Sequence, residues 1–251
     1  MMDVSVSVEN LSVSFGDYQI LKDINFRIPQ GDFATIIGPN GAGKTTLLKV
    51  LLGLIKPTSG RIRLFNKKIH EVSPSLIGYV PQAKTMDRSF PAVAIELVMT
   101  GINSRWPWKL SKTERECALH ALERIGATHL AQRSISRLSG GELQRICLAR
   151  SIVRNPRIVM LDEPATGIDM VGEADLYKHL EQYQKDSKAT IMMITHDWHA
   201  VTNHADRVVL LNNRQIAFGT PNSVITENNL RQAFGHIGHE HSLSFLVKGN
   251  G

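Results

Sequence analysis

A glycine-rich segment, GPNGAGKTT at residues 38–46, has the residue types of a phosphate-binding loop. It follows the apolar run FATIIG at 33–38 and leads into a stretch with helical spacing. Glycines let backbone N–H groups curve around phosphate oxygens, and a helix N-terminus adds partial positive charge. Lys44 then reaches the β- and γ-phosphates, and the Thr45 hydroxyl ligates Mg²⁺. The strand–loop–helix order predicts a nucleotide site rather than a chance turn.

Two adjacent carboxylates, Asp162 and Glu163, follow the apolar run RIVML at 157–161. An unpaired buried charge is costly, so two acids at the end of a buried strand need partners. Mg²⁺ is the expected partner of Asp162, and an attacking water is the expected partner of Glu163, which would act as general base. The alternative is a strand-end turn with both acids in solvent. The presence of a phosphate loop in the same chain makes this alternative much less favoured.

A second glycine-rich segment, LSGGELQR at 138–145, opens another stretch with helical spacing. Its glycines and the following helix N-terminus have the character of a second anion site. The loop at 38–46 already has every part needed to hold the phosphates of one nucleotide. The second segment therefore needs an explanation of its own.

The elements that must position these residues follow from apolar periodicity. Strict alternation at 4–15 and 20–28 predicts half-buried antiparallel strands. Continuous apolar runs predict parallel strands buried on both faces, at 33–38, 77–80, 157–161, 190–194 and 207–211. Helical stretches separate them, at 44–53, 113–125, 141–154 and 173–185. The fold class is therefore α/β with a parallel-sheet core and an antiparallel β-subdomain.

One domain is expected over residues 1–222, with a helical subdomain inserted at about 83–149. Residues 223–251 are expected to form a short polar tail. With 251 residues and 42% hydrophobic content, the chain has enough apolar residues for one large core or two modest ones. No internal repeat is present, so each motif occurs once.

Composition also limits the compartment and the partners. No apolar run approaches the roughly 18 residues of a membrane span, and the N-terminus lacks the pattern of a secretory signal. Cys117 and Cys147 have no metal-ligand spacing; both are expected to be small core residues in a reducing compartment. The net charge is +6, but no dense basic block with interleaved aromatics appears, which disfavours nucleic acid as a partner.

Together, GPNGAGKTT, RIVMLDEP and LSGGELQR resemble the ATP-binding-cassette (ABC) ATPases, and the resemblance covers residues 4–222. It implies a P-loop ATPase fold with an antiparallel β-subdomain, a parallel-sheet core and a helical subdomain. It implies ATP and Mg²⁺ as cofactors, with Thr45, Gln82 and Asp162 near the metal. The loop positions that would bind ATP are Gly38, Pro39, Asn40, Gly41, Ala42, Gly43, Lys44, Thr45 and Thr46.

The resemblance also explains the second glycine segment. In the family, Ser139, Gly140 and Gly141 close on the ATP held by a second subunit, so a homodimer shares two ATP sites across one two-fold interface. Asp169 of PATGID matches the aspartate of the loop that follows the catalytic acid. The neighbouring residues depart from the commonest SALD form of this loop.

Three further side chains carry over one by one from the family. Phe15 matches the aromatic residue that stacks on adenine, with a strand-end core position as the alternative. Gln82 matches the glutamine that contacts Mg²⁺ and the attacking water. His196 of MMITHD matches the histidine that contacts the γ-phosphate, and it follows a predicted parallel strand, where ligands of such sheets bind. Glu163, His196 and Gln82 are therefore the expected catalytic residues.

A single short cassette resembles the ATPase subunit of an importer, peripheral at the cytoplasmic face of the membrane and docked on polytopic permease subunits. An extracytoplasmic binding protein is an indirect partner. Residues 87–109, which include Trp106 and Trp108, are expected to contact the permease; the alternative for both rings is packing on their own subdomain. SFPAVAIELVMTG and ATGID are similar to the subfamily that imports zinc, manganese or chelated iron. Zinc or manganese import is therefore expected.

Other functions remain open at this stage. The cargo could be another small substrate, or the chain could be a soluble ABC ATPase of iron–sulfur cluster assembly. A ribosome- or nucleic-acid-linked cassette is a third class, although those proteins generally have two cassettes or long coiled coils. The tail contains His236, His239, Glu240 and His241, which are zinc-ligand types, and a zinc-sensing tail is a hypothesis beside that of a solvated tail.

Overall fold

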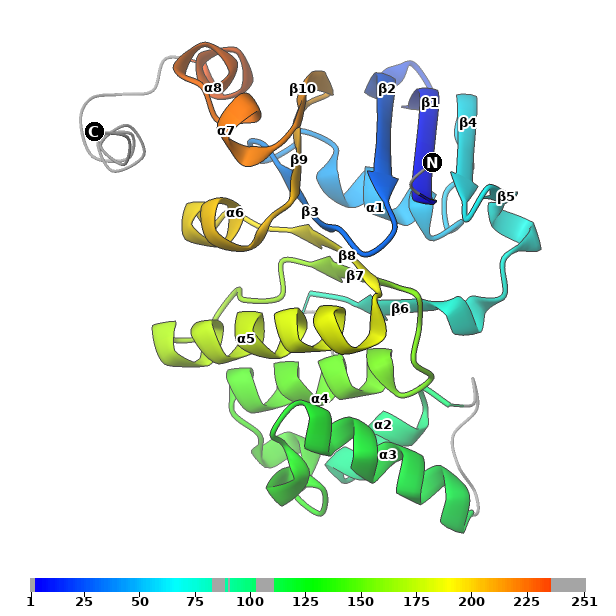
Figure 1. The fold of residues 1–251 in the computed structure, drawn as a ribbon, viewed down its shortest axis with the longest axis vertical. Coiled ribbons are helices and arrows are strands. Elements are labelled where there is room, and N and C mark those ends of the chain that lie inside the picture. The colour runs from blue at the N-terminus through cyan, green and yellow to red at the C-terminus, as the bar shows by residue number, and fades with distance from the viewer. Residues whose placement is uncertain (1–2, 83–88, 90, 103–110, 236–251) are drawn as a thin grey trace.

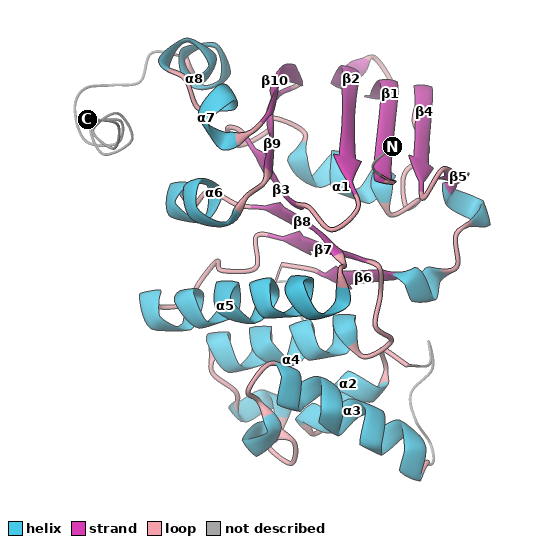
Figure 2. Cartoon of the chain, in the orientation of Figure 1, coloured by secondary structure: helices cyan, strands magenta, loops and turns pink. Residues whose placement is uncertain are grey.

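The computed structural model describes residues 3–82, 89, 91–102 and 111–235 of the chain (Figure 1). Ten of the 23 residues of the segment 87–109 expected to contact the permease, Trp106 and Trp108 among them, lie outside the described residues, as do the histidines of the tail. Ten strands form one continuous array in the order β5-β4-β1-β2-β10-β9-β3-β8-β7-β6. Helices cover both faces of its parallel part (Figure 2). The α/β class expected from the sequence is confirmed.

The parallel part of the sheet supplies the frame for the site. Its strands are β3 (Phe33–Ile37), β6 (Ile77–Val80), β7 (Ile158–Asp162), β8 (Thr190–Ile194) and β9 (Arg207–Asn212). They pair in parallel in the order β9-β3-β8-β7-β6, and β10 (Arg214–Gly219) joins β9 as an antiparallel neighbour. The five apolar runs of the sequence are therefore parallel strands, as predicted.

Successive residues of these strands enter different cores. Val159 and Leu161 of β7 face one hydrophobic cluster, whereas Ile158 and Met160 face another. The first cluster includes helices α4 (Gly140–Ile152) and α5 (Met170–Ser187), and the second includes α1 (Lys44–Leu51) with the antiparallel strands. Burial on both faces explains why these strands read as continuous apolar runs.

The antiparallel part is built on a long hairpin. Strands β1 (Val4–Phe15) and β2 (Tyr18–Pro29) pair with each other, and β4 (Ser59–Leu64) pairs with β1. The two-residue β5 (Lys67–Lys68) closes the outer edge, and β10 joins this part to the parallel strands through a pairing of Arg214 with Lys22. Short 3₁₀ turns at Ile69–Glu71 and Pro74–Leu76 lead from β5 to β6.

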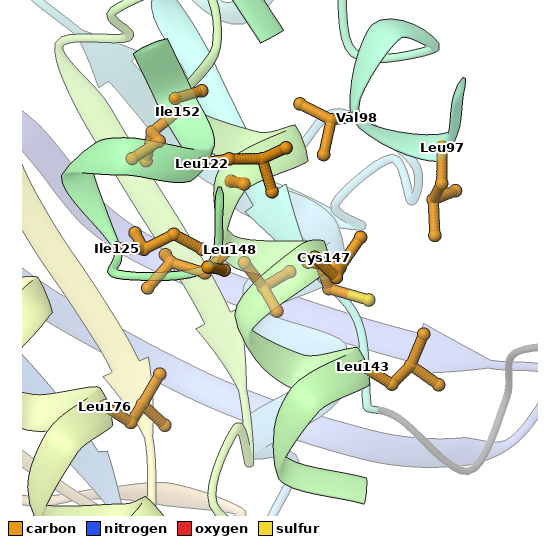
Figure 3. Close-up of a cluster of buried hydrophobic side chains, with 14 of the residues drawn as sticks. Leu97, Val98, Leu122, Ile125, Leu143, Cys147, Leu148, Ile152 and Leu176 are labelled. Atoms are coloured by element: carbon orange, nitrogen blue, oxygen red, sulfur yellow. The ribbon is translucent and has the colours of Figure 1, made fainter. Parts of the chain in front are cut away.

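The helical part contains α2 (Ala94–Met99), α3 (Lys112–Arg124) and α4, with short 3₁₀ turns at Thr128–Leu130 and Ile135–Arg137. Figure 3 shows Leu122 and Ile125 meeting Leu148 and Ile152 of α4. Cys147 is buried in this cluster as expected, but Cys117 is exposed on the outer side of α3, so its expected core position is wrong.

Two glycines pack closely on the last turn of α4, one from the sheet and one from the end of α2. A Cβ on Gly78 of β6 would lie 2.5 Å from the Ser151 carbonyl oxygen, and one on Gly101 after α2 would lie 2.2 Å from the Arg150 oxygen. Both carbonyls belong to the last turn of α4. Backbone therefore packs directly on backbone at this junction, which leaves no room for any larger residue.

The chain continues past residue 222 with ordered structure. Helix α6 (Trp198–His204) is followed, after β9 and β10, by α7 (Pro221–Val224) and α8 (Glu227–Phe234). Val224 and Ala233 are buried with Val201 and Leu210 in a small cluster. The sequence pattern indicated only a polar tail from residue 223, because α8 has a short apolar face. Among the described residues, no helix has the length and apolar composition to cross a membrane.

We expect Leu122→Ala to lower the free energy of unfolding by about 2–5 kcal/mol, because Leu122 is fully buried where α3 meets α4. Leu54→Ala is the matched control, since the Leu54 side chain is 67% exposed. Equilibrium urea unfolding of both variants and the wild type measures the difference. Equal losses for the two substitutions would contradict the packing described above.

Candidate nucleotide-binding and catalytic site

The phosphate loop spans residues 38–43, between the end of β3 and the first residue of α1. Gly43 caps the helix with φ 90°, and a Cβ there would lie 2.5 Å from Leu21 Cδ2. A Cβ on Gly38 would lie 2.1 Å from the Leu211 carbonyl oxygen. Both glycines are thus required by positive φ and by close approach, which leaves the backbone N–H groups near the helix N-terminus available to an anion.

Asn213, in the turn between β9 and β10, supports this loop from behind. Its backbone N–H donates to the Ala42 carbonyl at 3.1 Å, and its side-chain amide donates to the carbonyls of Ile20 and Gly41 at 3.0 and 3.3 Å. The sequence offered no signal for this role, since an asparagine beside Arg214 reads as an ordinary turn residue. The structure makes it a positioning residue for the phosphate loop.

The Lys44 side chain lies against the phosphate loop. Its Nζ donates to the carbonyl oxygens of Gly38 and Pro39 at 2.8 and 2.9 Å, and the residue is only 6% exposed. Burial lowers the pKa of the Lys44 ammonium, and the carboxylates of Glu163 and Asp162 act in the opposite direction. A buried ammonium beside a helix N-terminus is a strong attractor for phosphate.

Thr45 and Asp162, which the sequence indicated as ligands of Mg²⁺, lie in contact with each other. The Thr45 hydroxyl donates to Asp162 Oδ1 at 3.3 Å, which joins the first turn of α1 to the end of β7. Asp162 is 7% exposed, which contradicts the alternative of a solvated strand-end acid. Burial is the main cause of its raised pKa, and the Thr45 hydrogen bond acts in the opposite direction. Hydroxyl and carboxylate oxygens are ligands that suit Mg²⁺.

Glu163 lies at the centre of three side-chain hydrogen bonds. Gln82 Nε2 donates to its Oε2 at 3.1 Å, the Thr166 hydroxyl lies 3.3 Å from the same oxygen, and His196 Nε2 lies 2.5 Å from Oε1. These partners follow strands β6, β7 and β8, whose carboxyl ends meet at one edge of the sheet. Glu163 itself has φ 49°. The expected catalytic residues are therefore brought into direct contact.

Glu163 also separates two cavities. One of about 360 Å³ is lined by Ile20, residues 40–46 and Glu163, and the other, of about 280 Å³, is lined by Glu163, Thr195, His196 and neighbouring residues. The first cavity is the space above the phosphate loop. Ile20 was not among the predicted site residues, although its position between the exposed end of β2 and Leu21 places it at the mouth of this cavity.

The second glycine segment lies elsewhere in the chain's fold. Ser139 caps α4, accepting a hydrogen bond from the Glu142 backbone N–H at 3.2 Å and donating its own N–H to Glu142 Oε2 at 2.8 Å. That backbone hydrogen bond is the main cause of the lowered pKa of Glu142. The spacing S-x-x-E could have identified this capping box from the sequence alone.

Gly140 lies close to the loop that follows Glu163. A Cβ on Gly140 would lie 3.1 Å from the Gly167 carbonyl oxygen, and one on Gly141 would lie 3.3 Å from the Ile168 side chain. Asp169 caps α5 through a 3.0 Å hydrogen bond from the Gly172 N–H. In the described part of the chain, none of the residues around the 360 Å³ cavity belongs to this group. The chain's own loop and its own glycine segment thus form separate surfaces.

Phe15 ends β1 at the tip of the long hairpin, opposite Tyr18. The Phe15 residue is 52% exposed, so the alternative of a strand-end core aromatic is wrong. An exposed ring is available for stacking.

A comparison with known proteins decides the family. The family described as ABC transporter matches residues 21–166, which include the phosphate loop, the glycine segment at 138–145 and the acids that end β7. The chain belongs to the ABC transporter family. The recognition made from the motifs is confirmed.

Individual relatives of this ABC protein agree along most of its length. Zinc import ATP-binding protein ZnuC of Marinobacter nauticus is 39% identical over 238 residues, which cover 94% of this chain and 85% of the relative. The ZnuC protein of Photorhabdus laumondii is 36% identical over 241 residues, covering 95% and 87%. A metal-chelate type ABC transporter, solved in an inward-facing conformation, superposes with a TM-score of 0.81 at 28% identity, over 92% of this chain and 89% of the other.

We expect Asp162→Asn to raise the melting temperature of this ABC protein at neutral pH without nucleotide. Because the folded-state pKa of Asp162 is raised, the ionised carboxylate lowers stability above that pKa, and this cost disappears as pH falls below the unfolded value near 3.8. The gain in melting temperature should therefore shrink on acidification. The Mg²⁺–ATP-dependent rise in melting temperature should be smaller in the variant.

Differential scanning calorimetry over a series of pH values measures these shifts. Asp186→Asn is the control, because Asp186 is exposed on α5 and remote in sequence from the phosphate loop. A lower melting temperature for Asp162→Asn at neutral pH would show that the carboxylate stabilises the fold and would contradict this expectation.

Proposed function

We propose that the chain is the ATP-binding and ATP-hydrolysing subunit of a zinc importer, working with a membrane permease. The observation that carries the proposal is the contact of Glu163 with both Gln82 and His196, directly beside the Thr45–Asp162 pair and the phosphate loop. The zinc import relatives support the cargo, since they match this chain over more than nine tenths of its length. The proposed location is the cytoplasmic face of the membrane.

ATP would lie across the phosphate loop, with Phe15 stacked on the adenine and residues 38–46 around the phosphates. Lys44 and the N-terminus of α1 would bind the β- and γ-phosphates, exchanging the lysine's contacts with loop carbonyls for phosphate oxygens. Thr45, Asp162 and Gln82 would hold Mg²⁺, which neutralises charge on the β- and γ-phosphates when bound. The oxygen ligands that these side chains offer fit that ion.

Glu163 would act as general base in the hydrolysis. Its carboxylate accepts a proton from water as the water oxygen bonds to the γ-phosphorus, and the bond from that phosphorus to the β–γ bridging oxygen breaks to release ADP and phosphate. Gln82 and His196 restrict the carboxylate to one orientation. His196 would move to the γ-phosphate when ATP is bound.

A homodimer would complete each site. Ser139, Gly140 and Gly141 lie on a surface separate from the chain's own loop, so they are free to face the ATP of a second copy. Asp169 lies next to two strongly exposed apolar side chains, Met170 and Val171, which an interface would cover. Closing such a dimer on two ATP molecules makes its stability depend on nucleotide.

The permease would dock at a cavity of about 730 Å³ between β6 and the helical part. Ile77 and Tyr79 of β6 line one wall, and Leu97, Thr100 and Gly101 around α2 line another. These α2 residues belong to the segment 87–109 that the sequence indicated as the permease contact. Movement of a permease segment here would reach Glu163 through Gln82, which follows β6 by two residues. A binding protein outside the membrane would deliver zinc to the permease.

We expect Glu163→Gln to reduce ATP hydrolysis by about 10²- to 10⁴-fold, because the amide cannot accept the proton of water. The variant should still bind ATP and should accumulate as a dimer, whereas Lys44→Ala should remain monomeric through loss of binding. Phosphate release and size-exclusion chromatography with ATP measure both effects. Wild-type turnover in Glu163→Gln would remove Glu163 from the role of base.

In zinc-starved cells of the source organism, deletion of this chain should abolish uptake of radiolabelled zinc. Complementation with the wild type should restore it, and complementation with Glu163→Gln should not, because transport needs hydrolysis. Manganese and iron uptake, measured in the same cells, are the comparison. Loss of manganese or iron uptake with normal zinc uptake would reassign the cargo, and no change for any metal would contradict metal import.

A further inference from the structure

Most of the chain's net charge is concentrated in one short segment. Residues 56–72 contain five of the 29 lysines and arginines and one of the 23 acidic residues, a net charge of +4 compared with +6 for the whole chain. All five basic residues are exposed: Lys56, Arg61, Arg63, Lys67 and Lys68. We call this set the basic edge. Its segment runs from the end of α1 through β4 and β5, and β5 is the outer strand of the antiparallel part (Figure 1).

The strand register places Arg63 and Lys68 of the basic edge in one row with Arg27. Arg63 of β4 lies directly opposite Lys68 of β5 and opposite Ser7 of β1, and Ser7 in turn lies opposite Arg27 of β2. Directly opposed residues share one face of a sheet, and adjacent strands lie about 4.8 Å apart. Like charges placed opposite each other destabilise a sheet. The Arg63–Lys68 pairing therefore has a cost that an anionic partner would relieve.

Two carboxylates lie beside the basic edge in the described structure: Glu9 is opposite Arg61 in the strand register, and Glu71 accepts a hydrogen bond from the Lys68 backbone N–H. Arg27 pairs with Glu9 at 3.0 Å, whereas none of the five basic-edge side chains makes an ion pair. Lysines on a terminal strand also prevent edge-to-edge pairing, which accounts for Lys67 and Lys68. That purpose does not account for Arg63, because Arg63 is paired with Ser7 of β1 on one side and with Lys68 of β5 on the other.

The basic edge adjoins the wall of the 730 Å³ cavity. A Cβ on Gly53 would lie 2.8 Å from Ile69 Cγ2, which brings the loop after α1 against the turn that follows Lys68. Leu54 in that loop is 67% exposed, two residues before Lys56. Six residues after Lys68, Pro74 lines the cavity together with Ile77. An exposed apolar side chain among cations is typical of a surface that meets lipid headgroups.

We propose that the basic edge binds the anionic headgroups of the membrane in which the permease lies. The proposal rests on the proposed function for its orientation, since a permease seated in the cavity would bring the neighbouring basic edge toward the bilayer. Nucleic acid is the less suitable polyanion. The only Phe, Tyr or Trp in residues 56–72 is Phe65, and the Arg157 guanidinium covers its ring at 4.5 Å, so no free ring is offered for base stacking.

The test is sedimentation of the purified full-length chain with vesicles. We expect binding to phosphatidylcholine vesicles that contain phosphatidylglycerol, weak binding to phosphatidylcholine alone, and loss of binding as salt is raised. Arg61→Gln with Arg63→Gln should weaken binding about 30-fold, from roughly fivefold per cation near an anionic surface. Lys178→Gln with Lys185→Gln on α5 is the control with the same charge change and should bind as the wild type does.

Melting temperature and ATPase rate, measured in the same preparations, establish that each variant is folded. If the arginine pair does not fold, Lys67→Gln with Lys68→Gln replaces it with the same expectation. Equal binding to both vesicle types, or equal losses in the test and control pairs, would overturn the proposal. So would tighter binding to an RNA oligonucleotide than to the anionic vesicles at the same salt. An inactive ATPase that still binds vesicles through these arginines would contradict the proposed function and leave this inference intact.

Discussion

The hydrogen bonds to Glu163 connect the ends of three parallel strands. Gln82 follows β6, Glu163 follows β7, and His196 follows β8, and each strand is held in register with its neighbour by main-chain hydrogen bonds. A carboxylate at this position needs a rigid frame, because a small shift of one strand end would separate the base from its partners. The two hydrophobic cores on opposite faces of the sheet supply that rigidity. The site's geometry is therefore a direct product of sheet packing.

Charged side chains are buried at the same edge of the parallel sheet, which costs folding free energy. Lys44 and Asp162 are both buried. Burial lowers the pKa of the Lys44 ammonium and raises the pKa of the Asp162 carboxyl, so it favours the neutral form of each group. The lysine is stabilised by loop carbonyls and the aspartate by the Thr45 hydroxyl, so neither lies without a polar partner. Such a site is less stable than an apolar one of equal size, and a charged ligand would offset part of that cost. Stability and nucleotide binding are thus linked through the same few atoms.

Sequence reasoning was most successful where local chemistry decides the conformation. The continuous apolar runs identified the parallel strands, and the glycines at 38 and 43 identified the phosphate loop, since positive φ and close packing exclude other residues there. It was less successful where tertiary contacts decide. Asn213 supports the phosphate loop through the β9–β10 turn, and Cys117 is exposed because α3 turns that side outward. Both depend on how distant elements pack, which periodicity does not encode.

The glycines at 78 and 101 determine how closely the last turn of α4 packs against its neighbours. The last turn of α4 is held between β6 on one side and the end of α2 on the other, with carbonyl oxygens too close for any side chain. A joint of this kind resists sliding, because displacement along the helix would drive these backbones into each other. The two contacts meet at adjacent residues of α4, and Gly78, Gly101, Arg150 and Ser151 all line the 730 Å³ cavity, so whatever occupies that cavity touches sheet and helical part at their closest point.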